Sequence, residues 1–123
     1  MRRMALALLI LAASPAVAVA AELLMVEQPG CLWCRRWHDE IGPGYPKSTE
    51  GQIAPLRRVQ LGTVPPGVTF KVPVTLTPTF VLVENGHEVG RLSGYAGSNF
   101  FYGMLAPLLD KLKPAQQAEV TRP

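Results

Sequence analysis

Cysteine is scarce in this sequence: Cys31 and Cys34 are the only two cysteines among 123 residues. A small secreted domain that depends on disulfides for its stability usually carries more than one bridge. A bridge between these two residues would also close a very short ring, and the stabilisation from a disulfide grows with the length of the loop that it closes. The scarcity of cysteine therefore disfavours a purely structural disulfide.

Long apolar runs are also missing. Met4–Ala13 is an apolar run of ten residues, whereas a helix needs about 20 to cross the hydrocarbon core of a bilayer. The run follows Arg2 and Arg3 and precedes the small residues Ala18-Val19-Ala20. This order is typical of a secretory signal peptide with its cleavage site.

We therefore expect residues 1–20 to be a signal peptide that is cleaved near Ala20-Ala21. Residues 21–123 would then form a single domain in the periplasm or another exported compartment, where disulfides form and persist. An uncleaved membrane anchor is the alternative for the N-terminal segment.

A strong net charge is missing once this segment is set aside. Without Arg2 and Arg3, ten lysines and arginines stand against nine aspartates and glutamates, a net charge close to +1. The basic character of the full chain thus belongs largely to the N-terminal segment, and it gives no reason to expect binding to nucleic acid.

The sequence does contain a regular alternation of predicted strands and helices. We predict a strand at 22–28, a helix from the cysteines to Ile41, a short helix followed by a strand at 56–61, a long connection, a hairpin turning at Asn85-Gly86, and a final helix. This order predicts an α/β fold: a mixed sheet of about four strands flanked by helices, built from a βαβ half and a ββα half.

The final helix is expected to begin after an N-cap at Ser98. Pro107 lies inside its apolar pattern and removes a backbone donor, so a kink or break is expected near residues 103–107.

The two cysteines lie in the stretch PGCLWCRRWHDEI, residues 29–41, where the first strand turns into the first helix. At this helix N-terminus, unpaired backbone N–H groups and the helix dipole are expected to lower the pKa of the Cys31 thiol. Cys34, one turn later, falls on the inward face with Trp37 and Ile41. An exposed thiol beside a shielded one suits thiol–disulfide exchange, in which one cysteine attacks and the other resolves the mixed disulfide.

Two other functions compete with redox exchange. Cys31, Cys34 and His38 have the types and spacing of ligands for a soft metal, and His87 is a candidate fourth ligand, so an exported copper or zinc metallochaperone is one alternative. A non-catalytic binding module is the other. Covalent c-type haem is excluded because Arg35, not histidine, follows Cys34.

The chain resembles the thioredoxin superfamily over nearly all of residues 22–113. The residues that carry the resemblance are Cys31-Leu32-Trp33-Cys34, Thr77-Pro78-Thr79, Asn85-Gly86 and Gly94. The resemblance implies a thioredoxin-like fold and a thiol–disulfide oxidoreductase that needs no cofactor, with Cys31 and Cys34 as its catalytic dithiol. It also implies a cis-proline, Pro78, facing the disulfide.

Four residues around the sulfurs are candidate substrate-binding residues: Trp33, Thr77, Pro78 and Gly94. A turn at Thr77-Pro78 would present backbone groups that can pair with an extended substrate segment. The buried acid of the family is replaced by Met25 in this chain, and Glu27 is expected to point differently, so no proton-transfer role is assigned to it.

A closer resemblance is to the small exported thioredoxin-like proteins of bacterial sulfur-oxidation systems. It is carried by TEGQIAPLRRV, PVTLTPTFVLVENG and GYAG followed by Phe100-Phe101. It implies a periplasmic protein, expected to be a monomer, that reduces a disulfide or persulfide on a partner protein. Its electrons would come from a membrane-bound or protein dithiol donor.

Overall fold

The computed structural model of the protein describes residues 10 and 21–112. The predicted signal peptide lies outside the described residues, Ile10 excepted. No helix of the described part is long and apolar enough to cross a membrane. Its elements, in chain order, are β1 (Ala21–Glu27), α1 (Leu32–Glu40), η1 (Tyr45–Lys47), α2 (Thr49–Ile53), β2 (Leu56–Gln60), β3 (Thr79–Glu84), β4 (His87–Ser93) and α3 (Ser98–Leu109).

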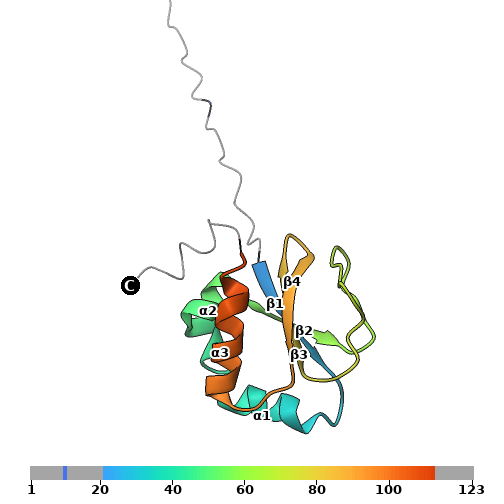
Figure 1. The fold of residues 1–123 in the computed structure, drawn as a ribbon, viewed down its shortest axis with the longest axis vertical. Coiled ribbons are helices and arrows are strands. Elements are labelled where there is room, and N and C mark those ends of the chain that lie inside the picture. The colour runs from blue at the N-terminus through green and yellow to red at the C-terminus, as the bar shows by residue number, and fades with distance from the viewer. Residues whose placement is uncertain (1–9, 11–20, 113–123) are drawn as a thin grey trace, which may run out of the picture.

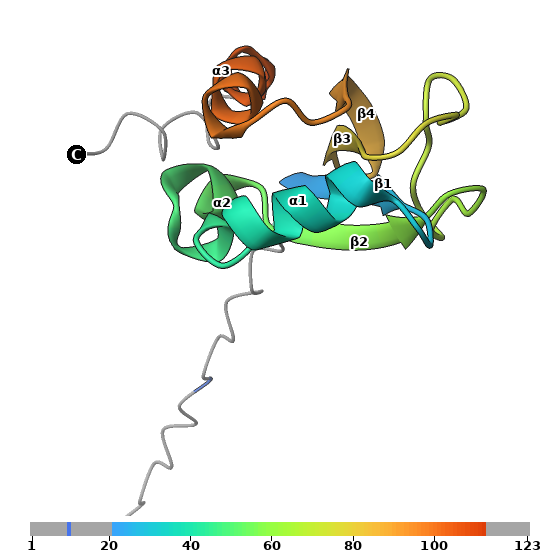
Figure 2. The ribbon, with the colours of Figure 1, turned by 90° about the horizontal axis from the view of Figure 1, so that it is seen from below.

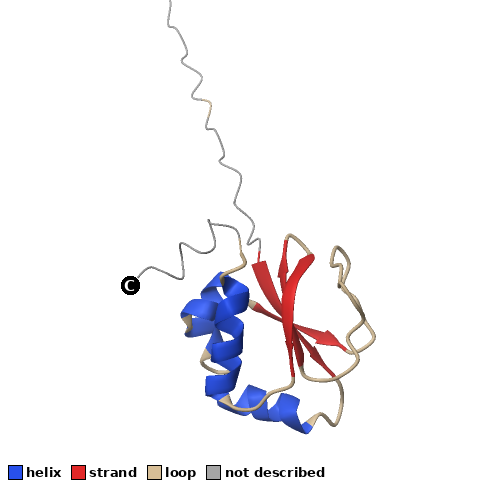
Figure 3. Cartoon of the chain, viewed as in Figure 1, coloured by secondary structure: helices blue, strands red, loops and turns tan. Residues whose placement is uncertain are grey.

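The strands form one mixed sheet of four, in the order β2-β1-β3-β4. β1 and β2 are parallel and are connected through α1 and α2, whereas β1–β3 and β3–β4 are antiparallel. The fold is therefore the predicted α/β fold, a βαβ half joined to a ββα half (Figures 1 and 3).

The two faces of the sheet are covered differently. Side chains alternate between the faces of a strand, so Leu23 and Met25 point to one side of β1 and Leu24 and Val26 to the other. The first pair belongs to the main core, which the helices complete with Trp37 of α1 and with Phe101, Leu105 and Leu109 of α3. All the helices thus cover one face, and Figure 2 shows α1, α2 and α3 wrapped around that side of the strands.

The long connection between β2 and β3 covers the other face in place of a helix. Leu61, Val68, Phe70 and Val74 pack against buried residues of β1, β2 and β3. Arg91 of β4 anchors the connection, because its Nη2 donates to the carbonyl oxygen of Val72 over 2.7 Å. This anchored segment then leads directly to Thr77 and the start of β3.

The hairpin between β3 and β4 turns where it is predicted to turn. Asn85 and Gly86 both adopt positive φ, 51° and 81°, which suits a two-residue connection between antiparallel strands. The turn lies at the end of the sheet opposite to α1 (Figure 1).

The last helix differs from the prediction at its N-cap and at Pro107. The N-cap of α3 is Gly97, not Ser98, because the chain enters the helix at φ 101°, a conformation that favours glycine. The helix also continues through Pro107, so the predicted break is absent, and the alternative of a kink stays a prediction. Proline removes a single backbone donor, and α3 ends two residues later, so few helical hydrogen bonds depend on this position.

Candidate active site

The turn between β1 and α1 fixes the position of Cys31. Gly30 has φ 77°, and Cys31 follows as the N-cap of α1. Its Sγ accepts a hydrogen bond from the backbone N–H of Cys34 over 3.2 Å, and the two cysteines are joined in a disulfide. A sulfur at this position lies close to backbone N–H donors and to the positive end of the helix dipole. Both stabilise a thiolate once the disulfide is reduced.

The two sulfur-bearing residues differ in exposure, as predicted. Cys34 is 3% exposed and belongs to the main core with Trp37 and Ile41. Cys31 is partly exposed and lies at the edge of that core. Leu32 and Trp33 between them are both exposed. A protein sulfur that approaches from solvent therefore meets Cys31 first.

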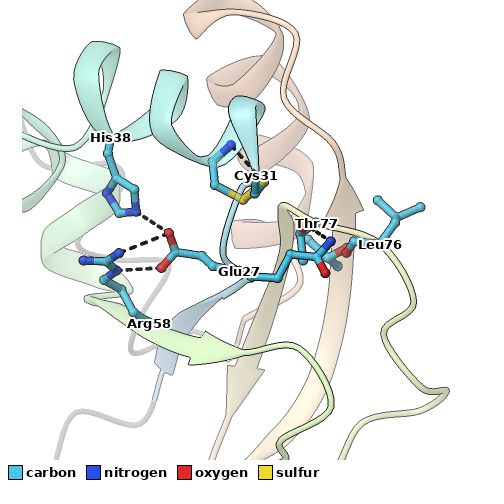
Figure 4. The surroundings of a disulfide bond; sticks show 9 residues. Glu27, Cys31, His38, Arg58, Leu76 and Thr77 are labelled. Carbon is cyan, nitrogen blue, oxygen red and sulfur yellow. Dashed lines mark hydrogen bonds and ion pairs between the residues drawn. A yellow bond between two sulfur atoms is a disulfide. The ribbon is translucent and has the colours of Figure 1, made fainter.

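The Thr77-Pro78 segment lies at the same end of the sheet as the cysteines. β1 and β3 are antiparallel, with Val26 opposite Thr79, so the residues after β1 and before β3 are neighbours. Gln28 Nε2 donates to Thr77 Oγ1 over 2.9 Å, and Figure 4 shows Thr77 on this side of the disulfide. The Thr77–Pro78 peptide is cis, the geometry that the resemblance implies.

Gly94 joins the same group of residues through its backbone. Its φ is 85°, and its N–H donates to the carbonyl oxygen of Pro78 over 2.7 Å. The structure thus brings Thr77, Pro78 and Gly94 together beside the α1 N-terminus that carries Cys31.

The proposed metal ligands do not come together. His38 lies on α1, but its Nε2 is 2.6 Å from Oε1 of Glu27, and His87 lies beside the distant hairpin turn (Figures 1 and 4). Among residues 21–112, no group of three or more His, Cys, Asp or Glu side chains is arranged to hold a metal ion. The metallochaperone hypothesis therefore finds no ligand cluster in the described part of the chain.

Glu27 is the residue near the site that sequence reasoning misplaced. It lies two residues after Met25 on β1, so it points to the same face of the sheet, toward α1, and it is 5% exposed. Arg58 Nε donates to its Oε2 over 2.6 Å, and His38 contacts its Oε1 (Figure 4). The alternation of side chains along a strand predicts that Glu27 shares the face of Met25, and this signal could have placed Glu27 correctly.

The partners of Glu27 determine its ionisation. Burial alone would raise the pKa of this carboxyl, but hydrogen bonds from Arg58 and His38 outweigh burial and leave the pKa below its ordinary value. Glu27 is therefore ionised at neutral pH, as the centre of a hydrogen-bonded cluster that links β1, α1 and β2.

Comparison with solved structures identifies the family. The chain is similar to the periplasmic thioredoxin SoxS from Paracoccus pantotrophus. The two sequences are 51% identical, and the crystal structure of reduced SoxS matches this structure with a TM-score of 0.74. The similarity covers 76% of this chain and 99% of SoxS. The chain belongs to the thioredoxin superfamily. Within this superfamily, it is related to SoxS-like thioredoxins, as the sequence predicts.

A second similar structure is the thioredoxin Mala s 13 from Malassezia sympodialis, which is 17% identical with a TM-score of 0.48, over 73% of this chain and 76% of that one. No family model and no curated protein matches the sequence. Membership of the superfamily, together with the Cys31–Cys34 disulfide at the start of α1, makes the protein a thiol–disulfide oxidoreductase.

Proposed function

We propose that the protein is an exported oxidoreductase that reduces a disulfide or persulfide on a partner protein through Cys31 and Cys34. The observation that carries this proposal is the asymmetry of the pair, a partly exposed Cys31 at the helix N-terminus and a buried Cys34. Export is supported by the predicted signal peptide and by the similarity to a thioredoxin that is described as periplasmic.

The reaction with a disulfide proceeds in two exchanges. The Cys31 thiolate attacks one sulfur of the partner disulfide, whose S–S bond breaks, and the leaving thiolate takes up a proton. The Cys34 thiol then loses its proton and attacks Cys31 Sγ, which releases the second partner thiol and forms the Cys31–Cys34 disulfide. A protein dithiol or membrane-bound donor supplies the two electrons that reduce this disulfide again.

The reaction with a persulfide uses the same two cysteines. Cys31 attacks the outer sulfur, so that the partner leaves as a thiol and Cys31 carries the persulfide. Attack of Cys34 on Cys31 Sγ then releases hydrosulfide and forms the same intramolecular disulfide.

We assign partner binding to the residues that surround Cys31, namely Trp33, Thr77, Pro78 and Gly94. Trp33, two residues after Cys31 in the chain, is 47% exposed and offers its indole to the partner. Leu76, just before Thr77, adds a second exposed apolar side chain. An extended partner segment would contact these side chains while its backbone pairs with the Thr77 segment.

Trapping of the mixed disulfide tests the proposed reaction. A Cys34→Ser variant keeps the attacking sulfur but cannot resolve the adduct, so it should accumulate a partner adduct in a periplasmic extract that dithiothreitol releases. The Cys31→Ser variant and the double variant are the matched controls and should form none. Equal adducts with Cys31→Ser would contradict the assignment of Cys31 as the attacking residue.

The proposed export has its own test. Mass spectrometry of the protein from fractionated cells should find it in the periplasmic fraction with an N-terminus near Ala21. A chain that keeps residues 1–20 and sediments with membranes would favour the uncleaved anchor instead.

A further inference from the structure

A continuous chain of side-chain contacts runs along the outside of α1, from Trp33 to the segment before α3. The guanidinium carbon of Arg36 lies 5.4 Å from the centroid of the Trp33 ring. Arg36 Nε donates to Oε1 of Glu40 over 2.8 Å. The second carboxylate oxygen of Glu40, Oε2, accepts a hydrogen bond from the hydroxyl of Tyr95 over 2.5 Å.

The far end of this chain is anchored in the core and reaches the other side of the active site. Tyr95 is 6% exposed and belongs to the main core. Its neighbour Gly94 donates its N–H to the carbonyl oxygen of Pro78. The contacts therefore connect the residue before Cys34 with the Thr77-Pro78 segment that lies beside the disulfide.

These contacts fix Arg36 from two directions. An exposed i,i+4 ion pair usually leaves both side chains mobile and contributes little. Here one partner, Glu40, is itself held by a buried hydroxyl, and the guanidinium lies against an indole, a favourable cation–π arrangement. Arg35 and Asp39 have the same spacing on the same helix, yet no ion pair joins them in the described structure.

We propose that Arg36, Glu40 and Tyr95 are positioning residues that orient the Trp33 indole to receive an apolar segment of a protein substrate. They thereby favour protein disulfides over small-molecule disulfides. This inference rests on the proposed function, because it assigns to Trp33 a partner-binding role. Arg36, Glu40 and Tyr95 act through Trp33 and do not themselves contact the reacting sulfurs.

Two variants break the chain at different points, and a third is the control. Arg36→Gln removes the cation beside the indole, and Tyr95→Phe removes only the buried hydroxyl that holds Glu40. Arg35→Gln removes the same charge from the neighbouring position of α1 and leaves these contacts intact. Each variant is assayed with insulin as the protein disulfide and with 5,5′-dithiobis(2-nitrobenzoic acid) as the small disulfide.

We expect Arg36→Gln to raise KM for insulin about two- to fivefold, the range of a partly exposed cation–π contact. Tyr95→Phe should change KM in the same direction, and kcat and the rate with the small disulfide should stay within about twofold for both. The double variant should have the same KM for insulin as Arg36→Gln, because Tyr95 acts on Trp33 only through Arg36. A merely structural defect would slow both substrates alike.

Acrylamide quenching of tryptophan fluorescence reports directly on Trp33 in the oxidised protein, because Trp37 is fully buried. Quenching should increase in Arg36→Gln and Tyr95→Phe but not in Arg35→Gln. If quenching in Arg36→Gln and Tyr95→Phe matches that in Arg35→Gln, these residues do not position Trp33, and the inference is overturned. If their KM values for insulin also match that of Arg35→Gln, the proposed selectivity is overturned as well. A wild-type protein that reduces only the small disulfide would instead contradict the proposed function.

Discussion

Substitution of Glu27 by glutamine removes the buried negative charge at the centre of this cluster while it keeps the size of the side chain. In the native protein, the Glu27 carboxylate accepts two hydrogen bonds from Arg58, over 2.6 and 3.3 Å, and contacts His38 over 2.6 Å. Glutamine offers a single acceptor oxygen and an amide that repels the guanidinium. The substitution therefore removes one of the two acceptor oxygens and the negative charge that strengthens every hydrogen bond to Glu27.

The expected cost is about 1–2 kcal/mol in the free energy of unfolding. Hydrogen bonds to charged groups contribute about 1.5–3 kcal/mol, against about 0.5–1.5 kcal/mol for neutral ones. The Arg58 side chain is 66% exposed, so water can replace much of the hydrogen bonding that Arg58 loses when Glu27 is substituted. The contribution of the Arg58 hydrogen bonds to the cost is therefore at the lower end of the range for charged groups. Arg58→Gln is the matched control and should cost less than Glu27→Gln, because it leaves Glu27 paired with His38.

The pH dependence gives this prediction a second test. The pKa of Glu27 is lowered in the folded protein, so the stabilisation is complete above the pKa of the unfolded chain and is lost as the pH falls through the folded pKa. Urea unfolding of the oxidised proteins should thus show the full difference near pH 7 and a difference that shrinks as the pH falls below the ordinary pKa of a glutamate. Equal stability at pH 7, or a difference that does not shrink in acid, would refute the account of the cluster.

Further predictions concern the cysteines and two glycines. The double variant Cys31→Ser, Cys34→Ser should still unfold cooperatively in urea, because so short a ring contributes little chain entropy, and loss of cooperativity would restore a structural role for the disulfide. Gly51→Ala should lower stability by about 1–3 kcal/mol or prevent folding, because its Cβ would lie 1.8 Å from the carbonyl oxygen of Tyr45. Gly103→Ala, which meets open space within α3, should instead stabilise the protein by about 0.5–1 kcal/mol, and similar effects of the two substitutions on the unfolding midpoint would contradict these contacts.

The parts of the structure that sequence predicts well depend on local chemistry. The hairpin follows from Asn85-Gly86, whose positive φ values are required by the turn. The placement of Cys31 and Cys34 follows from a helix that begins at the cysteines, since helical spacing then directs Cys34 inward with Trp37. The order of short strands and helices was enough to predict the mixed sheet.

The parts that sequence reasoning missed depend on contacts between distant residues. Arg58 reaches Glu27 from β2 because β1 and β2 pair in parallel with Met25 opposite Arg58, and no local pattern specifies that register. Tyr95 donates a hydrogen bond to Glu40, a residue 55 positions away in the sequence, and no local pattern specifies that contact either. The face of Glu27 was predictable from strand alternation, whereas its partners were not.

The rate of alkylation of each cysteine in the reduced protein tests the central claim most directly. Cys31 Sγ accepts a hydrogen bond from the N–H of Cys34 and Cys31 is partly exposed, whereas Cys34 is buried. Iodoacetamide near neutral pH should therefore label Cys31 well before Cys34. Peptide mass spectrometry over a time course gives both rates in one sample. Preferential labelling of Cys34, or equal rates at the two sites, would contradict the assignment of Cys31 as the nucleophile.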